Sequence, residues 1–428
     1  RRPARLPAPR PQLQSDLLTI SPCQTPYLIS MTQASPFFKR AMMRHSVAAI
    51  GKLGQVAADM TKTHELRTMR ALHAYTGQLR REDPATPPIV MTAKYKLPDP
   101  PEAQYVYGRY ENPTLETAEA AIACFEDAPV VAFPSGMGAI SAALFATVEQ
   151  GDRILLPSDG YFAVRNLHAS LLSRFGVEAE YVSTVDMTTA DLSPFKVVWA
   201  ETPSNPGLDV CDLSLLSEQC KAAGALLIVD NTTATPLLQA PLDLGADIAV
   251  CSDTKAMAGH SDVLFGHCAT RDQNLQASIR EWRTIAGSLA NPFDAFLVHR
   301  GLLTLEIRLE RMCSNALAAA QLFNAHEATG AVRYPGLPTD PSFELAAQQM
   351  RLPGFVVGVT FADQAQANQF IDLCPALFPS TSFGGVHSSI ERRARWGDNV
   401  EEGFVRVSLG CEPTEPLLDA IESALNAL

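Results

Sequence analysis

The chain has 428 residues, and 46% of them are hydrophobic, which is typical of a globular protein with a large buried core. Its formal net charge of −12 argues against a nucleic-acid partner, because binding to a phosphate backbone requires a basic surface. No run of about 18 uncharged apolar residues occurs, so the sequence predicts no membrane span.

The amino-terminal segment differs from the rest of the chain in charge. Residues 1–58 carry eight Lys or Arg residues and one acid, Asp16. An Arg-rich, acid-poor amino terminus can be an organelle transit peptide, and a solvated arm explains it equally well. Residues 1–62 also lack a clear period, which predicts a mobile N-terminal extension.

The nine cysteines include no C-x-x-C pair, so the sequence indicates neither a zinc site nor a disulfide framework. Most of them lie inside apolar runs, where Cys behaves as a small hydrophobic residue. This usage fits a reducing compartment. We therefore expect a cytoplasmic protein without a metal ion, with the transit peptide as the open alternative.

Six prolines between positions 84 and 101 exclude long helices and sheet interiors from that region. From residue 114 onward, short apolar segments alternate with helical ones, which predicts an α/β fold with a mostly parallel sheet covered on both faces. The predicted strands are 130–133, 153–156, 196–201, 225–230, 247–252 and 263–269, and the predicted helices are 114–126, 136–148, 162–175, 213–223 and 292–327. Strands near 355–361 and 404–409, with helices near 364–373 and 414–427, predict a smaller α+β domain.

Two charged residues follow neighbouring predicted strands. Asp230 ends the strand 225–230, where a carboxylate can keep a pyridinium nitrogen protonated and so turn the ring into an electron sink. Lys255 follows the next strand, where an amine can form an imine with an aldehyde cofactor, and the hydroxyls of Ser252 and Thr254 can bind phosphate oxygens. Alone, the Asp would be a turn residue and the Lys a surface charge; together they indicate pyridoxal 5'-phosphate.

A turn over residues 133–138 joins a predicted strand to a predicted helix. Its small residues let backbone N–H groups approach a phosphate at the amino terminus of the helix. Gly136 and Gly138 also match part of the dinucleotide pattern G-x-G-x-x-G, but Ser141 occupies the third glycine position. The turn is therefore interpreted as a site for the phosphate of the smaller cofactor.

Residues 255–262 resemble the cofactor-lysine signature of the trans-sulfuration, or Cys/Met metabolism, family of pyridoxal-phosphate-dependent enzymes. The resemblance covers roughly residues 64–428 and includes motifs at 107–114, 135–137, 201–206, 230–232 and 406–410. It implies a fold type I transferase with an N-terminal arm at 63–113 that contributes to a neighbouring active site, a cofactor-binding large domain at 114–312 and a C-terminal domain at 313–428. It also implies a homotetramer, a dimer of dimers with shared active sites.

The resemblance implies roles for the matching positions. Tyr107 and Arg109 would bind the cofactor phosphate of a neighbouring subunit, since the guanidinium fork presents paired donors. Gly136 and Met137 would offer backbone N–H groups to the same phosphate. Tyr161 would stack on the pyridine ring and assist proton transfer. The remaining implied contacts are Asn205 with the phenolic oxygen, Arg406 with the substrate α-carboxylate, and Ser388 near Arg406.

Some positions depart from the family pattern. Ala163 stands where methionine γ-lyases usually carry a cysteine, which argues against methionine as the substrate. His387 replaces the usual glutamate near the substrate, and we hypothesise that it tunes the site by titrating near neutral pH. Both departures concern the choice of substrate and leave the cofactor assignment unchanged.

Residues 390–398 and 299–301 resemble a subgroup named as cystathionine γ-lyases. We therefore expect a small sulfur-containing amino acid as substrate and γ-elimination of cystathionine to cysteine, 2-oxobutanoate and ammonia. Arg392, Arg393 and Arg395 are candidates for the distal carboxylate, with a solvated basic loop as the simpler interpretation of each. The alternatives are γ-replacement on O-acylhomoserine, as in a cystathionine γ-synthase or homoserine sulfhydrylase, a methionine γ-lyase, or a catalytically silent protein that binds the cofactor.

Overall fold

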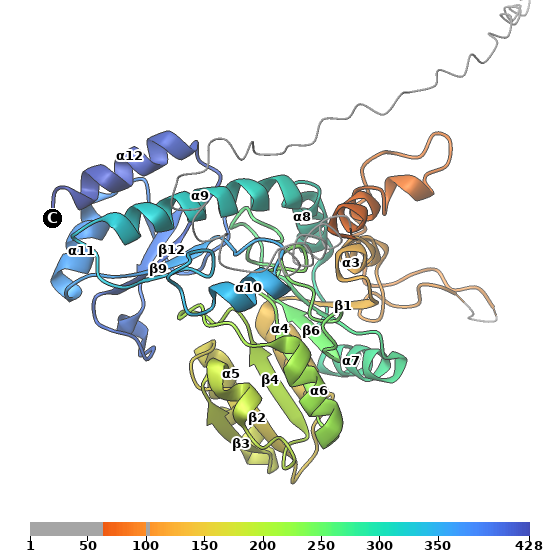
Figure 1. Ribbon diagram of the computed structural model, residues 1–428. Helices are drawn as coiled ribbons and strands as arrows, with labels where there is room; N and C mark the ends of the chain where they lie inside the picture. Colours follow the sequence, from red (N-terminus) through yellow and green to blue (C-terminus); the bar gives the residue numbers. More distant parts are fainter. Residues whose placement is uncertain (1–62, 100–102) are drawn as a thin grey trace, which may run out of the picture. The chain divides into compact units, whose positions relative to one another are not determined.

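Seven strands form the larger of two sheets in the computed structural model (Figure 1), which describes residues 63–99 and 103–428. The predictions made for residues 1–62, including the transit peptide, lie outside the described residues. The strand order is β1-β7-β6-β5-β4-β2-β3. Its members are β1 (Val130–Phe133), β2 (Arg153–Pro157), β3 (Glu178–Val182), β4 (Val197–Glu201), β5 (Leu226–Asp230), β6 (Ile248–Cys251) and β7 (Gly266–Ala269).

The large sheet is mostly parallel, as predicted. The neighbouring pairs within β6-β5-β4-β2-β3 are parallel, and β7 runs antiparallel to both β1 and β6. Every residue of β4 is buried, because this central strand is covered on both faces.

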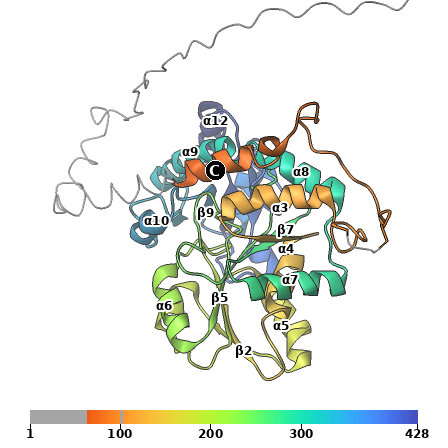
Figure 2. The ribbon, with the colours of Figure 1, turned by 90° about the vertical axis from the view of Figure 1, so that its right-hand side faces the viewer.

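Helices cover both faces of the large sheet (Figure 2). Val197 and Trp199 of β4 pack in one hydrophobic cluster, and the alternate residues Val198 and Ala200 pack in another. The first cluster is covered by α4 (Gly136–Phe145), α5 (Phe162–Ser170) and α7 (Gln273–Ala286). The opposite face is covered by α3 (Pro113–Glu126), α6 (Leu213–Ala223) and α8 (Pro292–Leu302).

Side-chain caps fix where several of these helices begin. The side chain of Asn112 accepts hydrogen bonds from the backbone N–H groups of Thr114 and Leu115, and Pro113 occupies the first helical position of α3. Ser135 caps α4 by accepting from Gly138 N at 3.0 Å. The predicted phosphate-binding turn is therefore a capped helix start.

The second sheet belongs to the C-terminal part of the chain. Its strand order is β10-β11-β12-β9-β8. Its elements are α9 (Leu305–Ala325), β8 (Val332–Arg333), α10 (Phe343–Gln349), β9 (Val356–Thr360), α11 (Gln364–Leu373), β10 (Phe378–Pro379), β11 (Ser389–Arg392), β12 (Phe404–Ser408) and α12 (Thr414–Leu425). The first half of α9 packs in the core beneath the large sheet, and its second half packs in the core of the small one. The domain boundary proposed at 312/313 thus falls in the middle of one continuous helix.

Several elements differ from the sequence prediction. The edge strand β3 was not predicted, because its residues are mainly exposed and polar and form no apolar run. The helices α7 and α10 were not predicted either. The strand expected over 263–269 begins only at Gly266, because Phe265 exchanges hydrogen bonds with Thr254 in the turn that precedes Lys255.

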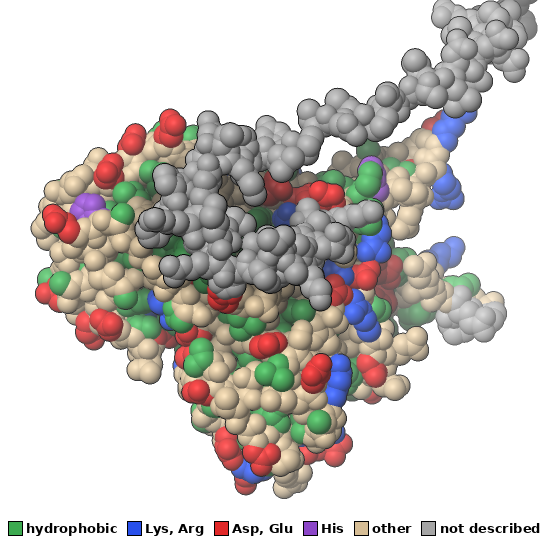
Figure 3. Space-filling view, in the orientation of Figure 1, with side chains coloured by type: hydrophobic (Ala, Val, Ile, Leu, Met, Phe, Trp, Pro, Cys, Tyr) green, Lys and Arg blue, Asp and Glu red, His purple; other side chains and the backbone are tan. Residues whose placement is uncertain are grey.

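The proline-rich arm contains little regular structure. Residues 63–72 are helical, a short 3-10 turn follows at Thr76–Gln78, and an isolated bridge pairs Lys94 with Tyr107. Figure 3 shows acidic side chains scattered over one face of the molecule, in keeping with the net charge of −12. No helix within 63–99 or 103–428 is long and apolar enough to cross a membrane.

Candidate active site

A cavity of ≈460 Å³ lies at the carboxyl ends of β4, β5 and β6, where Glu201, Asp230 and Ser252 are found. Its wall also includes Arg406, which comes from β12 of the small sheet. The predicted site residues that line it are Gly136, Met137, Tyr161, Asn205, Asp230, Ser252, Thr254, Lys255 and Arg406. Residues separated by up to 270 positions in the sequence therefore meet in one cavity.

Lys255 lies inside this cavity, with its amine held by a loop of the C-terminal part. Nζ donates a hydrogen bond of 2.8 Å to Ser382 Oγ and lies 5.3 Å from the centre of the Phe383 ring. Burial lowers the pKa of Lys255 to about 8, the Arg406 guanidinium adds to that effect, and Asp230 opposes it. A neutral amine is therefore accessible close to neutral pH, as a nucleophile or a proton acceptor requires.

The loop after Lys255 is anchored by a buried arginine, Arg308, that no sequence motif marked. The Arg308 guanidinium donates to the carbonyls of Ala256 at 2.7 Å, Met257 at 3.0 Å and Gly301 at 2.8 Å. Gly259 has a φ of 74°, and a Cβ there would overlap the Arg308 guanidinium. Hydrogen bonds from the Arg308 side chain to main-chain carbonyls therefore hold the loop that follows Lys255.

Two carboxylates lie side by side at the strand ends. Glu201 and Asp230 are partners in the register of β4 and β5, and both are buried. Glu201 accepts hydrogen bonds from the backbone N–H groups of Tyr161 at 2.6 Å and Asn205 at 2.8 Å, so it positions two other site residues. Burial raises the pKa of both carboxylates, and the charge of Asp230 raises that of Glu201 further. Asp230 is therefore the favoured carrier of the negative charge.

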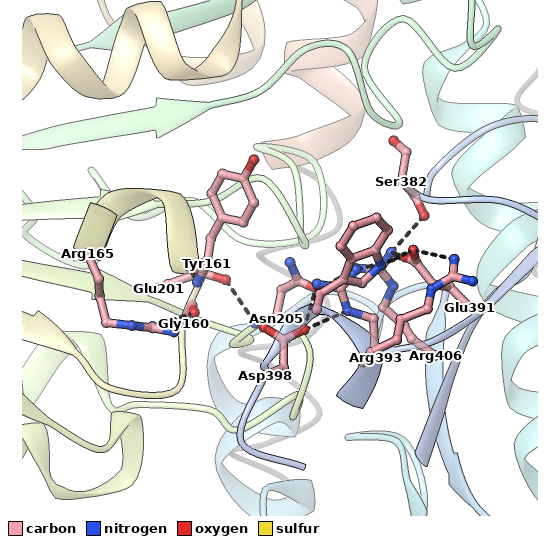
Figure 4. Close-up of polar contacts among 12 residues, drawn as sticks. Gly160, Tyr161, Arg165, Glu201, Asn205, Ser382, Glu391, Arg393, Asp398 and Arg406 are labelled. Carbon is pink, nitrogen blue, oxygen red and sulfur yellow. Dashed lines mark hydrogen bonds and ion pairs between the residues drawn. The ribbon is translucent and has the colours of Figure 1, made fainter. Parts of the chain in front are cut away.

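Arg406 is almost fully buried and makes three polar contacts (Figure 4). Nη1 donates to Asn205 Oδ1 at 2.5 Å, and Nη2 donates to the Ser382 carbonyl at 2.9 Å and to Glu391 Oε2 at 3.0 Å. Burial, with the neighbouring Arg393 charge, lowers its pKa to about 10, so Arg406 is a cation at neutral pH.

Ser382 links Lys255 and Arg406 and was not selected from the sequence. Its hydroxyl contacts Lys255 and its carbonyl contacts Arg406. Its φ of 80° is rare for a residue other than glycine, and strained backbone of this kind clusters at functional sites. In the sequence Ser382 is one more serine in a loop of Ser, Thr and Gly, so no pattern marked it.

Tyr107 and Arg109 do not line the cavity of their own chain. The Tyr107 side chain is exposed, and Arg109 Nη1 donates to the Thr284 carbonyl at 2.8 Å. The Arg109 guanidinium also lies 5.0 Å from the ring centre of Tyr110. Their role in a neighbouring subunit, implied by the resemblance, stays a prediction.

His387 and Ser388 lie in a second cavity of ≈830 Å³ that adjoins the first. The residues that line both cavities are Thr254, Leu264, Thr381, Ser382 and Phe383. The Ser388 hydroxyl donates to Glu412 Oε2 at 2.8 Å and accepts from Gly410 N at 2.8 Å. Ser388 therefore lines the adjoining cavity and not the Lys255 cavity, and its hydroxyl is already engaged.

The three arginines proposed for a distal carboxylate occupy different environments. Arg393 is buried and lines the cavity, with ion pairs to Glu391 at 2.7 Å and Asp398 at 2.6 Å. Arg392 pairs with Glu402 outside the cavity, and Arg395 is half exposed. Arg393 alone of the three reaches the wall of the Lys255 cavity.

Comparison with known proteins gives consistent matches. The family model described as Cys/Met metabolism PLP-dependent enzyme matches residues 70–426. A protein of Streptomyces coelicolor named "Putative cystathionine gamma-lyase" is 44% identical over 365 residues, which cover 83% of this chain and 93% of that protein. The L-methionine gamma-lyase of Pseudomonas deceptionensis is 34% identical over 84% of this chain and 97% of its own.

A solved structure is similar over nearly its whole length. The cystathionine gamma synthase of Xanthomonas oryzae pv. oryzae, in complex with cystathionine, has a TM-score of 0.81 and 34% identity, covering 84% of this chain and 97% of its own. The proteins that resemble this chain therefore carry the names of several reactions on related sulfur amino acids.

The geometry of the cavity fits pyridoxal phosphate. A Cβ at Gly136 would lie 2.5 Å from Ser252 Cβ, so only glycine allows the start of α4 to approach this side chain. Backbone N–H groups at the start of α4 and the Ser252 hydroxyl lie together and suit a phosphate. Thr254 also lines the cavity, and its hydroxyl exchanges hydrogen bonds with the main chain of Phe265. Asp230 and Lys255 complete the same cavity, as an ionised partner for a pyridine nitrogen and an amine for an aldehyde.

Proposed function

Because the chain belongs to the pyridoxal-phosphate-dependent enzymes of Cys/Met metabolism, we propose that it catalyses the γ-elimination of L-cystathionine. One cystathionine and one water give L-cysteine, 2-oxobutanoate and ammonia. The observation that carries this proposal is the meeting of Lys255, Asp230, Tyr161 and Arg406 in one cavity.

Bound pyridoxal phosphate supplies an electron sink for the charge left when a substrate loses its α-proton. In the proposed site the Lys255 amine would hold the cofactor by its aldehyde, and as a free amine it would accept and return protons of the substrate. The buried Asp230 carboxylate balances a positive charge on the ring nitrogen. Gly136, Met137, Ser252 and Thr254 would hold the phosphate, Tyr161 would cover the ring, and Asn205 would contact the phenolic oxygen.

Arg406 holds the α-carboxylate of the amino acid in this proposal. Its guanidinium and the Lys255 amine both contact Ser382 and both lie within 5.3 Å of the Phe383 ring centre. A carboxylate on Arg406 therefore brings the α-carbon to the side of the cavity where Lys255 can take the proton.

Cystathionine as substrate is supported by the relative named "Putative cystathionine gamma-lyase" and by residues 390–398. Arg393 and Trp396 of that segment line the cavity, so a polar substrate side chain finds a cation and an indole there. The second candidate is γ-replacement on an O-acylhomoserine, favoured by the relatives named cystathionine gamma-synthase. Methionine is less favoured, since Ala163 replaces the cysteine usual in its lyases.

We propose that the protein assembles as a dimer of dimers in the cytoplasm. Tyr107 and Arg109 lie outside the cavity of their own chain, which is where residues shared with a neighbouring site would be. The cysteines among the described residues are all free thiols, which supports a reducing compartment.

The proposed reaction is tested by incubating the purified protein with cystathionine, with methionine, and with O-acetylhomoserine plus cysteine. We expect 2-oxobutanoate and free cysteine from cystathionine at a higher kcat/KM than 2-oxobutanoate from methionine. Cystathionine formation in the third mixture at a higher kcat/KM would identify a synthase instead. Turnover of none of the three by protein loaded with cofactor would favour the silent binding protein.

A further inference from the structure

Glu391 lies directly opposite Arg406 on the neighbouring strand of the small sheet. The two residues are partners in the antiparallel register of β11 and β12, which places their side chains on the same face. The Glu391 side chain is 1% exposed. Its Oε2 accepts from Arg406 Nη2 at 3.0 Å and from Arg393 Nη1 at 2.7 Å (Figure 4). Its Oε1 accepts from Arg395 Nη2 at 3.1 Å and from Trp396 Nε1 at 2.7 Å.

Glu391 is an anion in the folded protein. Burial opposes its ionisation, but the hydrogen bonds from Trp396 and Arg393 and the charges of Arg393 and Arg406 outweigh burial and lower its pKa. Asp398 balances Arg393 from the other side at 2.6 Å. The buried cluster of Arg393, Arg406, Glu391 and Asp398 is therefore electrically neutral before a substrate carboxylate arrives.

The hydrogen bonds that Arg406 already donates limit how it can bind another carboxylate. A guanidinium has five N–H groups, and a bidentate carboxylate needs Nη2 together with Nη1 or Nε. In this structure both N–H groups of Nη2 are engaged, one by the Ser382 carbonyl and one by Glu391. A substrate carboxylate that binds in the paired mode must therefore replace one of these two acceptors.

Of these two acceptors, Glu391 is the one that can be displaced from Arg406 Nη2 at the lower free-energy cost. The Ser382 carbonyl belongs to the main chain and has no second donor among the described residues. Glu391 keeps Arg393, Arg395 and Trp396 as donors when Arg406 is removed from it. Releasing Arg406 therefore leaves no unpaired buried carboxylate.

We infer that Glu391 is the internal counter-ion of Arg406. In the free enzyme Glu391 occupies the place of the substrate α-carboxylate, and it releases Arg406 Nη2 when the substrate binds. Glu391 is a positioning residue in this account, since it acts through Arg406 and Arg393. The inference deepens the proposed function and rests on its assignment of Arg406 to the α-carboxylate.

The test compares Glu391→Gln with Glu402→Gln in the holoenzyme. Glu402 is the matched control, because it pairs with Arg392 of the same strand at 2.7 Å but is 69% exposed and outside the cavity. The ligands are L-alanine and ethylamine, which differ only in the carboxylate, and their Kd values are measured by calorimetry. The melting temperature of each ligand-free variant is measured in parallel.

Removing the Glu391 charge leaves one uncompensated buried cation, which a carboxylate ligand would neutralise. We expect Glu391→Gln to melt at a lower temperature than the wild type and to bind L-alanine at least about tenfold more tightly, a factor that corresponds to 1.4 kcal/mol. Its Kd for ethylamine should be unchanged, and Glu402→Gln should match the wild type throughout. Equal or weaker L-alanine binding by Glu391→Gln would overturn the inference.

Trp396 provides a second measurement that leaves Glu391 intact, should Glu391→Gln fail to fold. Its indole donates to Glu391 Oε1, so movement of Glu391 changes the surroundings of the indole. The fluorescence of Trp396 is the emission of the wild type minus that of Trp396→Phe. We expect L-alanine to change this difference and ethylamine to leave it unchanged. No change with L-alanine would mean that Glu391 stays on Arg406 and would refute the inference.

Arg406→Lys separates this inference from the proposed function. If Arg406 binds the α-carboxylate, this variant should lose most of the preference for L-alanine over ethylamine, because an ammonium cannot form the paired contact. Retention of that preference would remove the proposed role of Arg406 itself. Loss of the preference combined with unchanged Glu391→Gln binding would refute the counter-ion alone.

Discussion

Lys255 Nζ and Ser382 Oγ are joined by a hydrogen bond of 2.8 Å although they stand 127 positions apart in the chain. The Ser382 carbonyl is bound by Arg406, so one residue contacts two of the cations that line the cavity. Its left-handed backbone, with a φ of 80°, directs the two oxygens to different partners. Such a conformation costs on the order of 1–3 kcal/mol and persists only where its surroundings enforce it.

Ser382→Ala removes the acceptor of the Lys255 amine and preserves the backbone contact to Arg406. A hydrogen bond to a charged group contributes about 1.5–3 kcal/mol, so we expect kcat to fall roughly 10- to 100-fold with a smaller change in KM. Ser380→Ala, in the adjoining cavity, is the control and should keep wild-type kinetics. Unchanged kcat in Ser382→Ala would show that this contact does not position the amine.

The low pKa of Lys255 predicts the pH dependence of cofactor uptake. Burial and the Arg406 charge lower this pKa to about 8, so the neutral amine fraction rises as the pH increases through 8. The rate at which cofactor-free protein gains the visible absorption of bound cofactor should rise with it and level off above about pH 9. A midpoint near 10.5, the value of an ordinary lysine, would contradict the burial argument. Lys255→Ala should show no such absorption and no turnover.

A shared active site predicts complementation between two inactive variants. If Arg109 serves the site of a neighbouring subunit, a mixed dimer of Arg109→Ala and Lys255→Ala contains one site with both residues intact. Random reassociation of an equal mixture should then recover about a quarter of the wild-type activity, since half of the dimers are mixed and each has one working site. If Arg109 served its own chain, both sites of the mixed dimer would stay defective and no activity would return.

A buried histidine beneath the Lys255 turn predicts how stability changes with pH. His267 Nδ1 lies 2.8 Å from Asp253 and Nε2 lies 3.0 Å from Glu126. Burial opposes the charged imidazolium, but the two carboxylates outweigh it and raise the pKa of His267 to about 10. This stabilisation is complete below the unfolded pKa of about 6.5 and is lost as the pH rises through 10.

We therefore expect the wild-type melting temperature to fall between pH 7 and pH 10. His267→Gln removes one partner of a buried ion group and should lower the unfolding free energy by about 3–5 kcal/mol at pH 7. Between pH 7 and pH 10 the variant should then lose less stability than the wild type does. His73→Gln alters an exposed histidine and is the control. Parallel loss of stability with pH in wild type and His267→Gln would indicate that the imidazole is neutral.

The central strands and the cofactor half of the cavity could be predicted from the sequence. Their apolar runs reveal β4, β5 and β6, and the chemistry of Asp230 and Lys255 follows from their places at the ends of such runs. The substrate half could not be predicted in the same way. Ser382, Glu391 and Arg308 reach the site through contacts between segments far apart in the chain, and nothing in their local sequence distinguishes them from ordinary loop, strand and helix residues.

The continuity of α9 has a mechanical consequence. At 1.5 Å per residue its 21 residues form a rod about 31 Å long that is embedded in both cores. The walls that carry Lys255 and Arg406 are fastened to opposite halves of this rod, so they cannot hinge apart at the domain boundary without bending it. A hinge opening of the site at that boundary is therefore resisted by the stiffness of one continuous helix.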